Sequence, residues 1–172
     1  GAPILEYTLK NIVKYISKNS VYITISKKIT KNEKNLISDY TSNSLIYGGK
    51  TRFESLKLGL SAIDKTKYKY VMIHDGARPV IPHKMMQELL KSIKSGKYDT
   101  SVPYLDIEDT LRNKLNTLRR ENYQTFQTPQ IFKIELLFSN IKNKNTFCTD
   151  DLGIIEKKRS LKVKLVKSSK EN

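Results

Sequence analysis

The segment Tyr70-Val71-Met72-Ile73-His74-Asp75-Gly76-Ala77-Arg78-Pro79 joins a short apolar run directly to a polar loop. Residues 70–73 are typical of a buried strand, and in sheets that alternate strands with helices, ligands bind beyond the carboxyl ends of the strands. At that end Asp75 suits a divalent cation or a sugar hydroxyl, Gly76 lets the backbone approach a ligand, and Arg78 has a planar fork for phosphate. Taken alone, an Asp-Gly pair after a strand is as often a plain turn.

Strands and helices alternate on both sides of this segment. The apolar pattern predicts helices over residues 5–16, 33–39, 51–63, 85–93, 129–141 and 150–158, and strands over 21–25, 44–47, 70–73, 99–105 and 161–166. This order indicates an α/β fold with a mostly parallel sheet and helices on both faces. An irregular polar stretch interrupts the pattern over about residues 106–127.

The composition favours one soluble domain. The chain has 172 residues, of which 38% are hydrophobic, enough for a core of its own. No run approaches the length of about 20 apolar residues that a membrane span needs. The first residues lack the basic segment followed by an apolar segment that is typical of a signal peptide, so we expect a cytoplasmic protein. The single cysteine, Cys148, and two histidines exclude a disulfide framework and a Cys/His zinc site. Any metal would bind to carboxylates.

The net charge of +15 raises the question of nucleic-acid binding. Of the 32 basic residues only six are arginines, and the lysines are scattered along the chain, which is typical of a solvated surface. We therefore expect no nucleic-acid partner and keep a basic nucleic-acid-binding module as the alternative from another class. The arginines are Arg52, Arg78, Arg112, Arg119, Arg120 and Arg159.

Two further junctions carry polar residues where a helix is expected to begin. Gly48-Gly49-Lys50-Thr51-Arg52, with Ser55, offers glycines, amides and hydroxyls to a base or a phosphate. Thr128, before Pro129, is placed to cap the helix expected over residues 129–141, where free amides favour an anion. Ordinary helix capping explains each motif as well. Thr149-Asp150-Asp151 has the same form, and acids at a helix start need no metal.

The remaining polar residues form no nucleophilic site. Thr110, Arg119 and Arg120 lie in the stretch 106–127, where they form either an anion clamp or a solvated arm. No Ser/His/Asp or Cys/His set is credible, because His74 is expected to pack and hydrogen-bond at its strand end and Cys148 to fill apolar space. An enzyme with these residues would work by positioning and charge neutralisation.

Several of these motifs occur in one order: GGKTRFESLKLGL at 48–60, VMIHDGARPVI at 71–81, DTLR at 109–112, QTPQIF at 127–132, TDD at 149–151 and KLVKSSKEN at 164–172. In this order and spacing, nearly the whole chain resembles the 2-C-methyl-D-erythritol 4-phosphate cytidylyltransferases of the non-mevalonate isoprenoid pathway. HDGARP together with QTPQ is specific to this family and its relatives, the pentitol-phosphate cytidylyltransferases. The resemblance implies a Rossmann-like nucleotidyltransferase domain over residues 1–172, with an extended dimerisation arm at about 106–127.

The resemblance also implies a reaction and its residues. CMP would pass from CTP to 2-C-methyl-D-erythritol 4-phosphate with Mg²⁺, giving 4-diphosphocytidyl-2-C-methyl-D-erythritol and pyrophosphate. For the nucleotide, the resemblance implies Gly49 and Ser55 at the cytosine, with Arg52 bracing their loop, and Asp75 and Gly76 at the ribose and the metal. Arg78 would support the loop that carries Asp75. Thr128 would bind the substrate phosphate, and Thr110 and Arg120 would reach across from the partner in a homodimer. Asp75 and Arg120 would be catalytic, Arg120 by positioning the attacking phosphate.

The chain departs from the family pattern in several places. Lys50 stands where an acid is common, Gly76 where alanine is usual, and Arg119 where an aspartate usually precedes the arginine of the arm. The family's first strand, its Gly-rich triphosphate loop and a late lysine lie outside residues 1–172, so we expect a fragment with little or no activity of its own. A fusion to a cyclodiphosphate synthase domain, and ribitol 5-phosphate as the substrate, remain open alternatives.

Overall fold

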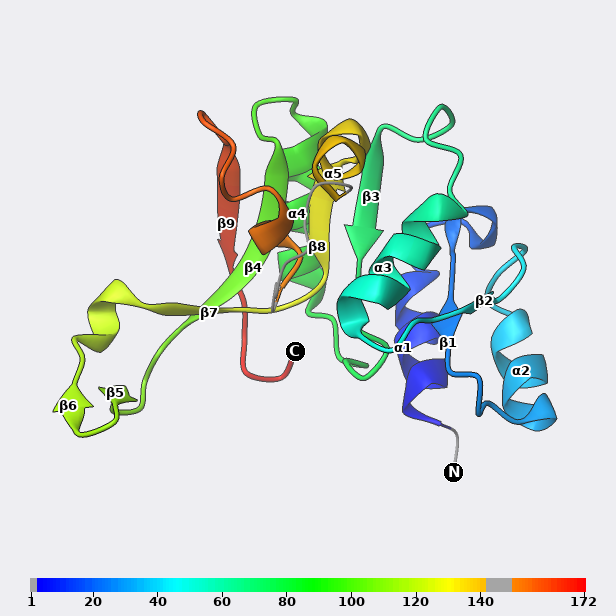
Figure 1. Ribbon diagram of the computed structural model, residues 1–172, viewed down its shortest axis with the longest axis horizontal. Helices are drawn as coiled ribbons and strands as arrows, with labels where there is room; N and C mark the ends of the chain where they lie inside the picture. Colours follow the sequence, from blue (N-terminus) through cyan, green and yellow to red (C-terminus); the bar gives the residue numbers. More distant parts are fainter. Residues whose placement is uncertain (1–2, 142–149) are drawn as a thin grey trace.

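Strand β8 (Gln130–Lys133) lies between β3 (Tyr70–Ile73) and β4 (Thr100–Asp106) in the main sheet of the computed structural model, which describes residues 3–141 and 150–172 (Figure 1). β8 is antiparallel to both neighbours, so β3 and β4 run in the same direction. Along β4, β7 (Gln124–Phe126) adds a further antiparallel pair, and β9 (Val163–Lys167) pairs in parallel. β3, β4 and β9 thus share one direction, and the α/β character predicted from the sequence is kept. The sheet is mixed rather than mostly parallel as predicted, because β8 and β7 run opposite to β4 and only β9 pairs with it in parallel.

Helices cover both faces of this sheet. The side chains of neighbouring β8 residues show this division, because Ile131 belongs to one hydrophobic cluster and Phe132 to the other. Successive residues of a strand point to opposite faces, so two cores are separated by one strand. The helices are α1 (Ile4–Ile12), α2 (Lys31–Ser38) and α4 (His83–Lys94) with the Ile131 cluster, and α3 (Arg52–Ser61) and α5 (Ile134–Ile141) with the Phe132 cluster.

A smaller sheet lies beside β3. Its strands β1 (Thr24–Ile25) and β2 (Ile46–Tyr47) are parallel, and α3 packs against both. Thr51 caps α3 as predicted, since its hydroxyl accepts the Glu54 amide hydrogen at 3.1 Å. The loop between β2 and α3 is thereby held next to the carboxyl end of β3 (Figure 1).

The chain leaves the body after β4 and returns as β7. At the far end of this excursion, β5 (Arg112–Asn113) and β6 (Asn116–Thr117) form a small antiparallel hairpin, followed by the 3-10 turn η2 (Arg120–Asn122). Figure 1 shows the segment projecting from the rest of the molecule. Leu115 in the hairpin is 87% exposed. We call residues 107–123 the arm.

Two helices predicted from the sequence are wrong in part. Residues 130–133 form β8 and only 134–141 form a helix, because Gln130, Ile131 and Phe132 are buried in the slot between β3 and β4 and pair with both strands. In place of a helix over 150–158, the chain forms the 3-10 turn η3 (Leu152–Ile154), since the consecutive residues Ile154 and Ile155 are both buried.

The stretch expected to be irregular, about residues 106–127, contains the short elements β5, β6, η2 and β7. The remaining predicted helices and strands agree with the structure apart from their ends. β3 has the predicted bounds, whereas the strand expected over 21–25 is reduced to β1, and another short turn, η1 (Lys18–Ser20), precedes it. Gly96 follows α4 with a φ of 75°, a conformation that favours glycine and stops the helix. Among the described residues, no helix is long and apolar enough to cross a bilayer.

Candidate active site

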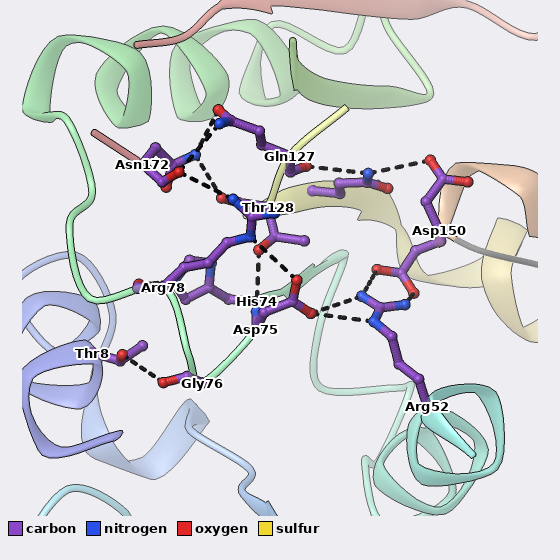
Figure 2. A network of polar contacts seen from close by, with 12 residues as sticks. Thr8, Arg52, His74, Asp75, Gly76, Arg78, Gln127, Thr128, Asp150 and Asn172 are labelled. Atoms are coloured by element: carbon purple, nitrogen blue, oxygen red, sulfur yellow. Dashed lines mark hydrogen bonds and ion pairs between the residues drawn. The ribbon is translucent and has the colours of Figure 1, made fainter. Parts of the chain in front are cut away.

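Asp75 lies just beyond the carboxyl end of β3, between two arginines (Figure 2). Its Oδ1 accepts hydrogen bonds from Nε and Nη2 of Arg52, at 3.2 and 3.1 Å. Its Oδ2 is 3.4 Å from Nε of Arg78. The Asp75 side chain is 37% exposed, so its carboxylate remains accessible to a ligand despite both contacts.

Arg52 is shared between two carboxylates. Besides Asp75, it binds Asp151 in a bidentate manner, with Nη1–Oδ1 and Nη2–Oδ2 distances of 2.6 and 2.8 Å. The Asp151 side chain is only 1% exposed. Its burial raises the pKa of the Asp151 carboxyl, an effect that Arg52 opposes, and Asp151 in turn raises the pKa of Arg52. The pair is therefore a partly buried, charge-assisted contact that fixes the start of α3.

Thr128 joins this group from the turn before β8. Its Oγ1 accepts the backbone N–H of Asp75 at 3.2 Å, so Thr128 holds the loop that carries Asp75. The side chain is not at a helix start as predicted, because β8 follows; the Thr128–Pro129 peptide bond is cis. Thr128 is only 5% exposed. The N-terminal dipole of a helix is thus absent from this position.

Asn172 fastens the same turn from the other side. Its Nδ2 donates to the Thr128 carbonyl at 2.9 Å and to Oε1 of Gln127 at 3.0 Å. Its backbone oxygen accepts from Nη1 of Arg78 at 3.0 Å, which connects the turn to the loop after β3 (Figure 2). Asn172 could not be predicted as part of this group, since a single asparagine carries no sequence signal for contacts with residues 78 and 127–128.

His74 has the packing role that the sequence predicts. Its Nε2 is 2.9 Å from the carbonyl oxygen of Arg78, and since that oxygen can only accept, Nε2 carries the hydrogen. Burial lowers the pKa of His74, which keeps the ring neutral. No partner for its buried Nδ1 exists among the described residues. His74 thus fixes the loop that presents Asp75.

The loop at residues 48–51 is closed by its own helix. The Ser55 hydroxyl accepts the Gly49 N–H at 3.1 Å and donates to the Thr51 carbonyl at 2.9 Å. The Glu54 carboxylate accepts the Lys50 N–H at 2.6 Å. An acidic side chain from the first turn of α3 therefore contacts the backbone at position 50. A Cβ at Gly49 would lie 2.3 Å from Cβ of Glu54, which explains why glycine is needed there.

Gly76 is held from the opposite side by α1. Its carbonyl accepts a hydrogen bond from the Thr8 hydroxyl at 2.8 Å. A Cβ at Gly76 would meet only the end of the Leu5 side chain, at 2.9 Å, and this flexible group can move. The glycine at this position therefore matters less for space than Gly49 does.

Arg52, Ser55, Asp75 and Gly76 line one end of a cavity of about 510 Å³. From this polar end the cavity continues along β3 and α3 as far as Tyr68 and the segment 16–24, where most of its lining is apolar. Thr128 contacts the backbone of Asp75 behind this wall. Thr110 and Arg120 are not brought to it within one chain, because they line a separate hollow of about 180 Å³ on the arm. There Arg120 donates to the Glu108 carbonyl and lies 3.6 Å from the Glu121 carboxylate.

Two features now point in the same direction: the polar residues grouped at the end of β3 and the cytidylyltransferase-like order of sequence motifs. A comparison with known families agrees with both. The model of the family described as 2-C-methyl-D-erythritol 4-phosphate cytidylyltransferase matches residues 1–172. The chain belongs to this cytidylyltransferase family. The Rossmann-like nucleotidyltransferase fold predicted from the sequence is thereby confirmed.

Individual members of the cytidylyltransferase family are similar over most of the chain. The Clostridium novyi 2-C-methyl-D-erythritol 4-phosphate cytidylyltransferase is 33% identical over 91% of this chain and 71% of its own length. A protein of Pelagibacter ubique named bifunctional enzyme IspD/IspF is 31% identical over 100% of this chain but only 46% of its own length, so the chain spans about half of that relative. The crystal structure of 4-diphosphocytidyl-2C-methyl-D-erythritol synthase from Anaerococcus prevotii superposes with a TM-score of 0.86 at 24% identity, covering 100% of this chain and 79% of that one.

Asp75 provides the accessible carboxylate of this candidate site. Among residues 3–141 and 150–172, no three His, Cys, Asp or Glu side chains gather as a metal site. Asp150 and Asp151 do not act as a pair, since Asp150 faces Gln130 and Asp151 faces Arg52; Thr149 and Cys148 lie outside the described residues. A single, partly exposed Asp75 fits Mg²⁺ that is bound jointly by one carboxylate and by nucleotide phosphates.

Proposed function

We propose that the protein transfers CMP from CTP to 2-C-methyl-D-erythritol 4-phosphate, releasing pyrophosphate. Membership of the cytidylyltransferase family supports this reaction. The observation that carries it is the position of Asp75, which stands at the end of β3 on a cavity that it shares with Arg52, Ser55 and Gly76. Carboxyl ends of strands are where folds of this class bind nucleotides.

The reaction joins two anions without a protein nucleophile. A phosphate oxygen of the sugar alcohol attacks the α-phosphorus of CTP, and the bond to the bridging oxygen breaks, so pyrophosphate leaves with the electron pair. The chain must therefore bring the phosphates together and offset their charge. The absence of a Ser/His/Asp or Cys/His set in the sequence is consistent with this mechanism.

The nucleotide side of the site would use the loop at 48–55 and the loop after β3. Gly49 and Ser55 would present backbone and hydroxyl oxygen to cytosine, with Arg52 as the brace. Asp75 and Gly76 would meet the ribose. Mg²⁺, when bound with CTP at Asp75, would neutralise charge on the triphosphate. Arg78 would support the loop through its contacts with Asp75 and Asn172.

The sugar-phosphate side would need a second copy of the chain. Thr128 would bind the substrate phosphate, and Arg120 and Thr110 would come from the partner's arm in a homodimer, with Arg120 positioning the attacking phosphate. The support is geometric: Thr110 and Arg120 share a hollow on a projecting arm that is separate from the cavity of their own chain.

A coupled pyrophosphate-release assay tests the reaction. CTP with 2-C-methyl-D-erythritol 4-phosphate is compared with CTP and ribitol 5-phosphate, using the 172-residue chain and the chain extended by the flanking residues of its gene. We expect turnover with methylerythritol phosphate to exceed that with ribitol phosphate, and to be greater in the extended protein. A preference for ribitol phosphate would make the protein a pentitol-phosphate enzyme, and no turnover in either protein would reject the proposal.

Complementation between subunits tests the arm. Asp75→Asn removes the carboxylate of the body, and Arg120→Ala removes the guanidinium of the arm; each variant alone should be almost inactive. In refolded mixtures, half of the dimers are mixed and each mixed dimer has one intact site, so about a quarter of wild-type activity should return. Two inactive proteins that stay inactive after mixing would show that Arg120 does not act across subunits.

Two further predictions from the sequence have indirect support. Relatives named bifunctional enzyme IspD/IspF support a fusion to a cyclodiphosphate synthase domain, which the reading frame of the parent gene would establish. The cytoplasmic location stays a prediction that fractionation of the source cells can test.

A further inference from the structure

The buried Asp151 is the strongest polar feature near the site that the proposed function leaves unused. Its carboxylate does not line the cavity, and it contacts Arg52 through both oxygens, at 2.6 and 2.8 Å. The contacts of Arg52 with Asp75 are longer, at 3.1 and 3.2 Å, and involve one oxygen only. Arg52 is therefore bound more closely to the buried carboxylate than to the exposed one.

The position of Asp151 is fixed by its surroundings. Its carbonyl accepts the Ile154 N–H at 3.1 Å, and the side chain of Asp150 accepts the Gly153 N–H at 3.2 Å, which closes the turn. Gln130 of β8, 1% exposed, accepts the Leu152 N–H at 3.1 Å. Asp151 is thus anchored to the main sheet independently of any ligand.

The anchored Asp151 affects the charge that Asp75 presents to the cavity. Arg52 approaches Oδ1 of Asp75 and Arg78 approaches Oδ2, so two cations compete with any metal ion for one carboxylate. Because Asp151 provides a second negative charge for Arg52, the positive charge of Arg52 is matched mainly at the buried end. Asp75 then retains negative charge toward the cavity.

We propose that Asp151 is a positioning residue that holds Arg52 against the side of Asp75 without letting it neutralise that carboxylate, which leaves Asp75 able to bind a nucleotide-borne divalent cation. The inference rests on the proposed function, since it assigns Asp75 to the metal side of the nucleotide. Without the charge of Asp151, Arg52 would turn its full charge to Asp75 and weaken cation binding there.

Paramagnetic broadening by Mn²⁺ tests this in solution. Mn²⁺ is titrated together with an equal concentration of CTP into the wild-type protein and into Asp151→Asn, and the loss of the Gly76 amide signal reports occupation of Asp75. We expect half-broadening in Asp151→Asn to need about fivefold more Mn²⁺, the size of effect that strengthening one partly exposed ion pair supports. An unchanged titration, or no selective broadening of Gly76 in the wild type, would overturn the proposal.

Two further variants separate charge from fold. Removing both charges with Arg52→Gln and Asp151→Asn together should restore Mn²⁺ binding to the wild-type level or better, because the competing cation is gone. Asp99→Asn is the matched control: it also removes a carboxylate paired with a cation, Lys133 at 2.8 Å, but at the opposite end of the sheet strands, and should leave the titration unchanged. A double variant that binds as poorly as Asp151→Asn would contradict the proposed role.

A measurement on the wild type alone keeps the proposal testable if Asp151→Asn does not fold. Bidentate pairing restricts rotation of the Arg52 guanidinium, so its terminal nitrogens should give separate NMR signals. Saturating Mg²⁺ should shift the Arg52 Nε–H but leave these signals separate; their merging would show that Asp151 does not hold Arg52. Neither readout depends on turnover, so a failed cytidylyl-transfer assay would reject the proposed function without deciding this inference.

Discussion

Gly49, in the loop between β2 and α3, has too little space for a larger side chain. A Cβ there would lie 2.3 Å from Cβ of Glu54, a contact that can be relieved only by moving the loop away from α3. The same movement would break the hydrogen bond between the Gly49 N–H and Ser55.

We therefore expect Gly49→Ala to lower the free energy of unfolding by about 1–3 kcal/mol, as overpacking does elsewhere, and to weaken CTP binding. Urea unfolding and isothermal titration with CTP measure the two effects. Lys50→Ala is the control, because only the backbone of Lys50 is used in the loop. Equal CTP affinity in Gly49→Ala and the wild type would rule out a role for this loop in binding.

Single residues show where sequence reasoning stops. Asp75 and His74 could be placed from the sequence because each follows directly from a strand end. Asp151 could not, since an acid after a threonine suggests a helix start, whereas its actual partner Arg52 is 99 residues away. Contacts of that separation leave no local pattern.

The strand β8 decides how the elements pack. The pattern from Pro129 to Ile141 fits an amphipathic helix, and that interpretation fails for the first residues because pairing with β3 and β4 satisfies their backbone better. Helices and strands whose period stands out, such as α4 and β3, were predictable, but short apolar runs such as 131–132 suit either state.

Because Phe132 is 0% exposed in this strand, truncating it should be costly. Phe132→Ala is expected to lower the free energy of unfolding by about 3–5 kcal/mol through lost burial and a cavity. Urea denaturation provides the measurement, and Phe126→Ala on β7, where the side chain is 36% exposed, is the matched control with a much smaller loss. Similar losses in both variants would contradict the central place of β8.

Asp99 connects the starts of β4 and β9 with the end of β8. It accepts from Nζ of Lys133 at 2.8 Å and from the Lys162 N–H at 3.1 Å. The hydrogen bond from Lys133 is the largest cause that lowers the pKa of this carboxyl from its ordinary value of 3.8. A carboxyl with a lowered pKa stabilises the fold above its unfolded pKa, and this contribution is lost as the pH falls through its folded pKa.

The free energy of unfolding should accordingly fall below about pH 4, and more steeply in the wild type than in Asp99→Asn. Chemical denaturation at several pH values between about 5 and 2 measures the slopes. Other paired acids keep some slope in the variant. If the two slopes agree, Asp99 has the same proton affinity in the folded and unfolded chains.

The arm divides the whole molecule into a packed body and a projection with little burial. Leu115 at the hairpin is 87% exposed, so its side chain contributes little to the packing of a single chain. In the proposed homodimer, Thr110 and Arg120 would complete the site of the partner subunit, since within one chain they remain on the arm.

Leu115→Asp is expected to change the free energy of unfolding by no more than about 0.5 kcal/mol, because the residue is exposed in one chain. If the arm mediates the dimer, the same change should shift sedimentation toward the monomer. Lys114→Asp is unsuitable as a control because Lys114 has a φ of 55°, so Lys91→Asp on α4 is used. A dimer equally stable in all variants would exclude the hairpin from the interface.

The pairing of Arg52 with Asp151 also has a bearing on biosynthesis. At about 5–20 residues per second, a ribosome needs about 5–20 s to pass from the codon for Arg52 to that for Asp151. During this interval the nascent chain contains the residues of α3 but has no buried counter-charge for the Arg52 guanidinium. Messenger RNAs truncated before codon 151 would thus yield polypeptides that contain HDGARP but lack Asp151, the carboxylate that holds Arg52.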